Sequence, residues 1–311
     1  MNGDQDPLTD APSDTLRPPP QLTAEEAAMM ADFRGRGLHP YYSHIAQKRI
    51  PGCENCGGRK CPRVCKMDGR SAGVEPAIAS GLAKLLAGCG VDALEEGEPG
   101  HITGVQVRVD DKTEVLTAKT YVLAAGSFGS PTLLLRSQGR SSAGCANSSG
   151  KVGRGLMFHI NNFFAVWPRR GRKPIGNSRA ISFRDFYVHK GYRLGLVQSM
   201  GFGADYGTIA MYLQMQIERS RLAKYKKLQP LLNIPALVAV KLFGDADVFV
   251  AQMEEFSDPQ NRVILNAEDP EVFTFKYTTA PEVSHRQALL RRAIRRTLGR
   301  WRIMLLSVNR S

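Results

Sequence analysis

A short apolar segment that runs directly into a helical pattern constrains the fold of this chain more than any other feature. Tyr121-Val-Leu-Ala-Ala-Gly126 reads as a buried strand that ends in small residues, and the helical run Ser130-Pro-Thr-Leu-Leu-Leu-Arg-Ser137 follows it. Small residues at such a junction let a ligand approach the backbone, and a helix N-terminus favours negative charge. Ala124, Ala125 and Gly126 are therefore candidate ligand-binding residues, with close strand–helix packing as the alternative.

The segments around this junction alternate between helix and strand. Thr23-Ala-Glu-Glu26 has the spacing of a capping box and predicts a helix to about Phe33. A second helix is expected over residues 77–87, and short strands over 91–95, 105–109 and 113–118, where apolar and polar residues alternate. Helix, strand, β-hairpin, buried strand and helix in succession predict an α/β arrangement.

Beyond residue 158 the pattern changes to recurring aromatic and β-branched clusters. These clusters predict strands of an antiparallel sheet at 160–167, 181–188, 194–200, 209–215 and 248–253. A helical interlude is expected over 222–243, and a final helix over 282–306. The expected fold class is α/β (α+β), with a boundary near residue 156. The expected parts are a lead-in with a short helix (1–45), an α/β domain with a Cys-rich loop (46–156), an antiparallel-sheet domain (157–281) and a C-terminal helix (282–311).

Four cysteines within thirteen residues form the most concentrated group of metal-binding side chains. Cys53, Cys56, Cys61 and Cys65 have the spacing Cys-x2-Cys-x4-Cys-x3-Cys in a Gly-rich loop. Thiolates bind zinc and iron–sulfur clusters, although this spacing matches neither standard ferredoxin pattern. Local disulfides and a reduced loop are the alternatives, so no metal is assigned.

The chain is basic, with 42 Lys+Arg against 29 Asp+Glu and a formal charge of +13. Much of the excess lies between residues 286 and 302, where Leu290, Ile294, Leu298 and Trp301 recur at helical spacing and predict a buried stripe. The arginines then cover the solvent face of that helix, and no aromatic platform or nucleic-acid motif accompanies them. We therefore expect no nucleic-acid partner.

The chain contains no apolar run of the ~20 residues that a membrane helix needs, so no membrane span is expected. Its first residues are acidic and lack the pattern of a secretory signal, so the default expectation is a cytoplasmic location. The histidines show no ligand spacing and no paired acid, and no serine or cysteine nucleophile has an obvious base. Gly201-Phe-Gly203-Ala-Asp-Tyr-Gly207 is expected to be a hairpin turn, because a β-patterned segment follows it.

Several ordered segments together resemble the glucose–methanol–choline (GMC) family of FAD-dependent oxidoreductases. They are the stretch Ala118-Lys-Thr-Tyr-Val-Leu-Ala-Ala-Gly126 with the helix after it, Ala146-Asn-Ser-Ser-Gly150 leading into Val152-Gly-Arg-Gly-Leu-Met157, and the segment 254–265. The resemblance implies a partial FAD-binding α/β domain with a β-hairpin insertion, and a substrate domain built on an antiparallel sheet. It also implies oxidation of a small-molecule alcohol by hydride transfer from the CH–OH carbon to flavin N5, with the electron acceptor open.

By position, the resemblance places Val91 at a backbone contact to the adenine end of FAD, and Ala124, Ala125 and Gly126 along the FAD cleft. The family's glycine-rich strand–helix unit is not found before residue 15, and its catalytic histidine segment is not reached by Ser311. We therefore expect a partial chain with an unassigned catalytic residue, weak FAD binding and no activity alone. The alternative is an electron-transfer module centred on an iron–sulfur or zinc site in the Cys loop.

Overall fold

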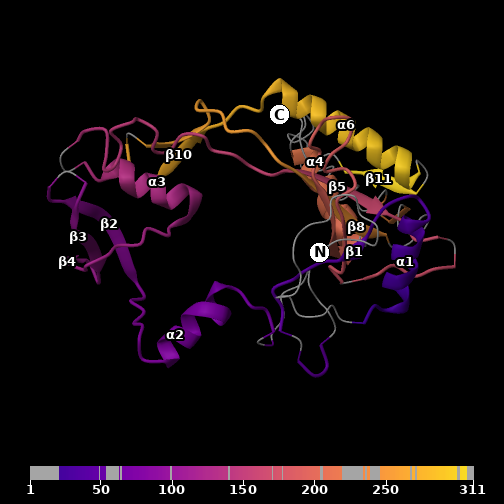
Figure 1. Cartoon of the computed structure of the whole chain (residues 1–311), viewed down its shortest axis with the longest axis horizontal. Helices are drawn as coiled ribbons and strands as arrows, with labels where there is room; N and C mark the ends of the chain where they lie inside the picture. Colours follow the sequence, from indigo (N-terminus) through magenta and orange to yellow (C-terminus); the bar gives the residue numbers. More distant parts are fainter. Residues whose placement is uncertain are drawn as a thin grey trace. The chain divides into compact units, whose positions relative to one another are not determined.

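The computed structural model describes most of the chain between residues 21 and 306 and divides it into two compact units. The described residues are 21–48, 50–53, 63, 65–98, 100–138, 141–169, 171–176, 178–203, 206–218, 234, 237–238, 246–266, 268–269, 272–299 and 302–306. Unit 1 comprises residues 1–73, 159–254 and 282–311, and unit 2 comprises residues 74–158 and 255–281. Each unit is described by itself (Figure 1).

Unit 1 is built on a six-stranded antiparallel sheet. The strands run in the order β1 (Tyr41–Tyr42), β6 (Ile181–Phe183), β7 (Leu196–Gly203), β8 (Asp247–Met253), β5 (Ile160–Val166) and β11 (Ile303–Leu305). The helices among its described residues are α1 (Ala24–Arg34), α4 (Tyr206–Glu218) and α6 (Pro281–Leu298), with the short π-helix η1 (Arg70–Val74) at its boundary. All pairs of neighbouring strands are antiparallel, as the sequence predicts for residues 160–253.

Alternate residues of β5 point to opposite faces of this sheet and divide the core in two. Phe164 and Val166 belong to the larger cluster, to which α1 contributes Phe33 and α6 contributes Leu290. Ala165 belongs to the smaller cluster, against which α4 packs. The larger cluster includes phenylalanine side chains that are fully buried, at positions 33, 164, 183 and 249. Phe33 contacts Phe183 and Phe249 edge to face, with ring centroids 5.4 and 5.7 Å apart.

A capping box at the start of α1 and a close backbone approach just before β7 fix where these two elements begin. The predicted capping box is present: the Glu26 amide donates to Thr23 Oγ1 (3.2 Å), and the Thr23 amide donates to Glu26 Oε2 (2.8 Å). Just before β7, Gly195 has a φ of +102°, and a Cβ added there would lie 1.9 Å from the Gln252 carbonyl oxygen. Only glycine fits this approach of the chain to β8.

The described residues of unit 2 form two small antiparallel sheets and two helices. One sheet has the order β2 (Cys89–Glu96), β3 (Ile102–Val109) and β4 (Lys112–Leu116), which confirms the predicted strands and hairpin. The other pairs β9 (Arg262–Leu265) with β10 (Phe273–Lys276). The helices are α2 (Glu75–Ala79) and α3 (Gly126–Arg136), and α3 packs on β2 and β9.

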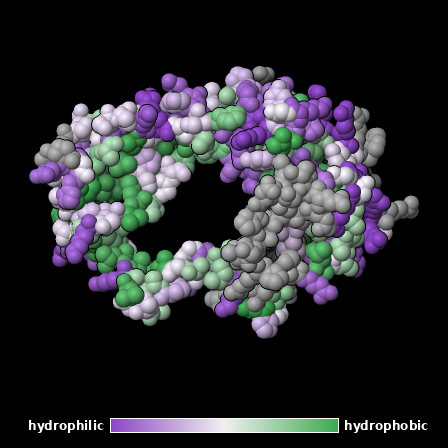
Figure 2. All heavy atoms as spheres, viewed as in Figure 1, coloured by the Kyte–Doolittle hydropathy of each residue, from purple (hydrophilic) through white to green (hydrophobic). Residues whose placement is uncertain are grey.

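The described residues of unit 2 bury few apolar side chains and expose many. The buried hydrophobic residues are Val107, Leu133, Cys145, Leu156 and Val263. Leu82 is 91% exposed and Val122 is 85% exposed, and Leu85 and Leu86 are also exposed. Figure 2 shows hydrophobic residues gathered on the visible face of this unit. We call the exposed residues Leu82, Leu85, Leu86, Val122 and Leu123 the apolar surface of unit 2.

Four of the expected elements differ in the structure. The helix expected over 77–87 ends at Ala79, because Gly81, with φ +75°, terminates it. Residues 121–124 form no strand within the described part of the chain. Residues 209–215 are helical, since they lie within α4, and the helix expected over 282–306 ends at Leu298 and is followed by β11. Most of the interlude expected over 222–243 lies outside the described residues.

Candidate functional site

The N-terminus of α3 is the point where the small residues singled out by the sequence come together. Ala124 and Ala125 are exposed and lead directly into the helix, which Gly126 begins. Ala125 occupies the N-cap position without a side-chain hydrogen bond, and the first turn contains no acidic residue. Gly126 has a φ of +77°, and a Cβ added there would meet no atom within 4 Å. No N-cap side chain therefore accepts a hydrogen bond from the first amide groups of α3, and a ligand can approach them. An anion-binding helix end requires both conditions.

Val91 lies at the opposite end of the same helix. Its side chain is 39% exposed on β2, and its carbonyl oxygen accepts a hydrogen bond from the Arg136 guanidinium in the last turn of α3. The Leu94 amide donates to Ser137 Oγ (2.9 Å), just past the helix, and fixes the same junction. Since α3 has eleven residues, Val91 and Gly126 are separated by a helix about 15 Å long. The structure therefore places the predicted residues at the two ends of α3 and not in one cluster.

An aromatic patch adjoins the N-terminal turn of α3, and the sequence analysis did not identify it. It consists of Phe128, Phe158, Phe273, Phe275 and Tyr277. The Phe128 ring of α3 stacks on Phe273 of β10 with centroids 4.9 Å apart, and Phe158 meets Tyr277 edge to face at 4.9 Å. Three of these rings, at positions 158, 273 and 275, are 37–51% exposed. The alternation Phe273-Thr-Phe275-Lys-Tyr277 was the available sequence signal, because period-2 aromatics share one face of a strand.

A hydrogen-bonded carboxylate fixes one edge of the aromatic patch. The Tyr277 hydroxyl donates to Glu255, with oxygen–oxygen distances of 2.7 and 2.8 Å, and the Phe158 amide donates to the same carboxylate at 3.1 Å. Burial, together with the Glu255 carboxylate, raises the pKa of Tyr277 to about 12. At neutral pH the phenol therefore stays protonated, and its hydrogen bond keeps the ring in place.

The Cys-rich loop is only partly described. Gln47 Nε2 lies 3.3 Å from Cys53 Sγ, and Cys65 is buried. Cys56 and Cys61 lie outside the described residues. Within the described part of the chain, no three His, Cys, Asp or Glu side chains are grouped as a metal site would need.

Two further interpretations of the sequence need correction. His39 has a paired acid after all: its Nδ1 lies 2.5 Å from Asp185 Oδ1, and its amide donates to Asp185 Oδ2 at 3.0 Å. The glycine-rich segment 201–207 is followed by the helix α4 and not by a strand, so the reason given for a hairpin turn is wrong. The strand β7, which ends at Gly203 within this segment, nevertheless belongs to an antiparallel sheet, unlike the βαβ context of a dinucleotide fingerprint.

Comparison with known proteins shows what part of the chain is similar to. Residues 23–161 match the family model described as GMC oxidoreductase, and this range includes α1, α3 and the β2–β4 sheet. The matched residues are less than half of the chain, and over this range the chain is similar to the GMC oxidoreductase family. The fructose dehydrogenase large subunit of Gluconobacter japonicus is 35% identical over 151 residues, which are 44% of this chain and 27% of that protein. The paromamine 6'-oxidase of Streptomyces fradiae is 30% identical over 175 residues, 49% of this chain and 32% of that protein.

The GMC match covers Val91, Ala124, Ala125 and Gly126 as well as part of the aromatic patch. GMC oxidoreductases generally bind FAD. The chain spans about a third or less of the length of these two relatives. No helix within the described residues is long and apolar enough to cross a membrane.

Proposed function

We propose that this chain is part of an FAD-dependent oxidoreductase that oxidises the CH–OH group of a small-molecule alcohol. The observation that carries the proposal is the open N-terminus of α3, reached through Ala124 and Ala125 and lying inside the segment that matches the GMC family. The names of the two relatives, a dehydrogenase and an oxidase, support the same class of reaction.

The residues at both ends of α3 fit an extended dinucleotide. The uncapped amides after Ala125 suit the negative charge of a pyrophosphate, and the absence of any atom near Gly126 leaves room for its approach. Val91 would then contact the adenine end through its backbone, beside the Arg136 guanidinium. FAD, when bound, supplies the two-electron acceptor for the hydride of the alcohol carbon.

The aromatic patch would serve the reaction by excluding water and orienting what binds beside α3. The rings of Phe158, Phe273 and Phe275 are 37–51% exposed, so they present flat apolar surface to a ligand, and Phe128 packs against them from the helix. Glu255 holds Tyr277 as a protonated hydrogen-bond donor and keeps that edge of the patch rigid. We assign no catalytic base and no electron acceptor to the chain.

The apolar surface of unit 2 supports a second element of the proposal, namely that the chain contains a partial FAD-binding domain with a β-hairpin insertion. Val122 and Leu123 are exposed in a segment whose apolar pattern is that of a buried strand. Large exposed apolar surfaces mark places that another part of a protein covers. We propose that further sheet of the FAD-binding domain pairs with residues 121–125 and covers this surface.

A charge placed at the α3 N-cap tests the proposal. Ala125→Asp and Ala125→Asn both add a good capping side chain, so neither variant should lower the stability of α3. The carboxylate introduced by Ala125→Asp would also repel a phosphate, so we expect this variant to bind FAD about tenfold more weakly than Ala125→Asn in a fluorescence titration. Equal affinities would remove the α3 N-terminus from the proposal.

The same titration measures how far the chain alone suffices. We expect saturable but weak FAD binding. The described residues supply only the contacts at the two ends of α3 and the aromatic patch, and a complete FAD site would need further contacts. Flavin retained at nearly one molecule per chain after purification would contradict that expectation, and no saturable binding would contradict the site itself.

A further inference from the structure

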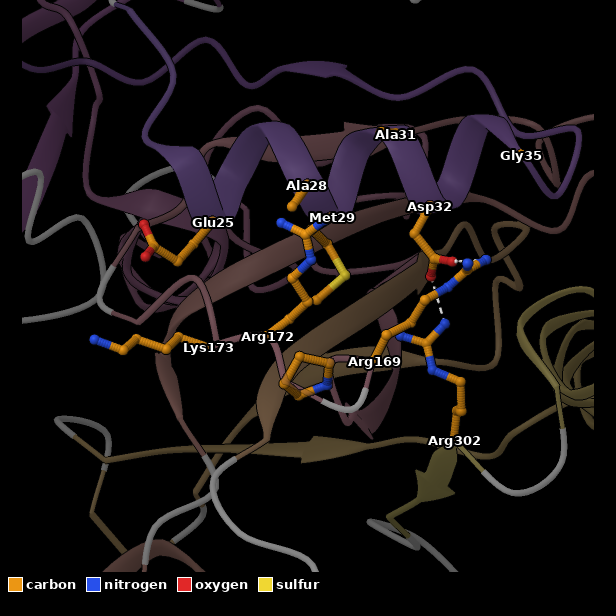
Figure 3. Close-up of a pocket in the computed structure, with 11 residues that line it drawn as sticks. Glu25, Ala28, Met29, Ala31, Asp32, Gly35, Arg169, Arg172, Lys173 and Arg302 are labelled. Carbon is orange, nitrogen blue, oxygen red and sulfur yellow. Dashed lines mark hydrogen bonds and ion pairs between the residues drawn. The ribbon is translucent and has the colours of Figure 1, made fainter.

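A cationic pocket lies within unit 1, remote in sequence from the α3 site and built from other elements. Its volume is about 330 Å³, within the range of small-molecule sites. Helix α1 forms one wall, and the loop after β5 together with Arg302 forms the other (Figure 3). The residues that line it are Glu25, Ala28, Met29, Ala31, Asp32, Gly35, Pro168, Arg169, Arg172, Lys173 and Arg302.

Asp32 organises one side of this pocket. Its side chain is 6% exposed and forms ion pairs with Arg302, with Arg169 (2.5 Å) and with Arg36 (3.4 Å). Arg302 also donates twice to the Trp167 carbonyl oxygen, at 2.8 and 3.2 Å, which fixes its guanidinium plane. A single carboxylate therefore holds three guanidinium groups in place, and their N–H donors outnumber the lone pairs that it can offer.

The other side of the pocket carries two cations with no such partner. Among the described residues, no hydrogen bond or ion pair to the side chain of Arg172 or Lys173 is found. Figure 3 shows the Arg172 side chain extending across the pocket beside Met29, with Lys173 on the side of Glu25. Four basic side chains against two acidic ones leave the lining with a surplus of two positive charges.

The chemistry of the lining selects a class of ligand. A surplus of two positive charges matches a dianion, and a guanidinium fork beside an ammonium group suits the oxygen atoms of a phosphate. Ala28, Met29 and Pro168 add an uncharged wall on which the rest of a small molecule can lie. We propose that this pocket binds a small phosphate monoester, with Arg169, Arg172 and Lys173 contacting the phosphate group.

Titration of the full chain with a sugar phosphate tests the proposal at constant ionic strength. Ribose 5-phosphate should bind saturably at one molecule per chain by calorimetry, inorganic phosphate should bind more weakly, and ribose and acetate should not bind. Inorganic phosphate binding as tightly as the monoester, or acetate binding as tightly as either, would overturn the assignment.

Two substitutions that each remove one positive charge distinguish binding in this pocket from general electrostatic attraction to a basic chain. Arg172→Gln should weaken ribose 5-phosphate binding about tenfold or more, because a charge-assisted hydrogen bond is lost. It should leave the unfolding midpoint unchanged, since the side chain bonds to no other described residue. Arg296→Gln removes the same charge from an exposed position on α6 and should leave binding unchanged. Equal losses in both variants, or none in Arg172→Gln, would show that the pocket is only an ion-pair network. Either result leaves the proposed FAD site untouched, because that site is tested by the variants of Ala125.

Discussion

The two units of this chain differ in how completely they bury their own apolar side chains. In unit 1 a six-stranded sheet carries helices α1 and α6 over one cluster, and phenylalanines 33, 164, 183 and 249 are fully buried there. In unit 2 no buried aromatic side chain is found among the described residues, and its apolar surface includes Leu82 and Val122, which are almost fully exposed. Burial of apolar area is the main stabilising term in folding, so we expect unit 1 to be more stable by itself than unit 2.

The sharpest test of this difference removes one apolar side chain from each unit. Phe249→Ala in the core of unit 1 should cost about 3–5 kcal/mol of unfolding free energy, because a large buried side chain leaves a cavity. Val122→Ala in unit 2 should change it by less than about 0.5 kcal/mol. Urea denaturation of both variants measures the effect. Similar losses would mean that Val122 is buried in solution and that the contrast between the units is wrong.

A buried guanidinium provides the next largest effect. Arg286 is 1% exposed and donates to the carbonyl oxygens of Arg193 (3.0 Å) and Glu254 (2.8 Å), while its Nε lies 2.6 Å from Glu282. Arg286→Met keeps most of the side-chain volume but leaves both carbonyls without this donor, so we expect a loss of about 2–3 kcal/mol. Arg296→Met, on the exposed face of the same helix, should cost less than about 0.5 kcal/mol in the same denaturation experiment.

A smaller effect in unit 1 depends on pH. Burial alone would raise the pKa of Asp32, but Arg302, Arg36 and Arg169 more than offset it, so the pKa lies below its usual value. A carboxylate with a lowered folded-state pKa stabilises the protein above its unfolded pKa of about 3.9, and this contribution is lost as the pH falls through the folded value.

Asp32→Asn should therefore lower the unfolding free energy by about 1–2 kcal/mol at pH 7. Between about pH 5 and pH 3 the wild-type chain should lose more stability than the variant, because only the wild type has this carboxylate to protonate. Parallel stability–pH curves for the two proteins would contradict the assigned role of the ion pairs.

The smallest change in stability is expected on the apolar surface of unit 2. The double variant Leu82→Ser, Val122→Ser should leave the unfolding free energy within about 0.5 kcal/mol, because both side chains are exposed. Its self-association, measured by sedimentation velocity, should nevertheless fall, since exposed apolar residues drive aggregation. A monodisperse wild-type monomer with one sharp, cooperative melt would argue against an uncovered surface.

The sequence predicted local patterns well and tertiary choices poorly. The β2–β4 hairpins follow from alternation between Val105 and Val109, and the capping box of α1 follows from Thr23 and Glu26, because neighbouring residues decide both. Residues 209–215 contain β-branched and aromatic residues that favour a strand. In α4, however, Ile209 and Leu213 lie one helical turn apart and pack on the same apolar cluster, so tertiary packing outweighs local propensity.

In the candidate site, too, the sequence predicted the local pattern but not the tertiary contacts. The local sequence pattern identified Ala124, Ala125 and Gly126, because small residues between an apolar segment and a helical run can be recognised without a structure. The aromatic patch joins α3 to β10, which are separated by more than 130 residues, so no local pattern could have assembled it. The strand expected at 121–125 is not formed in the described part of the chain, and strand formation depends on pairing partners that a local pattern does not reveal.

The close approach at Gly195 restricts how this chain can vary. Every single-nucleotide change to an amino acid in a glycine codon introduces a side chain, and the first carbon of any side chain would fall 1.9 Å from a backbone oxygen of the adjoining strand. A backbone oxygen cannot swing aside as a long side chain can. A saturation library at this codon that is selected for folded protein should therefore return glycine alone.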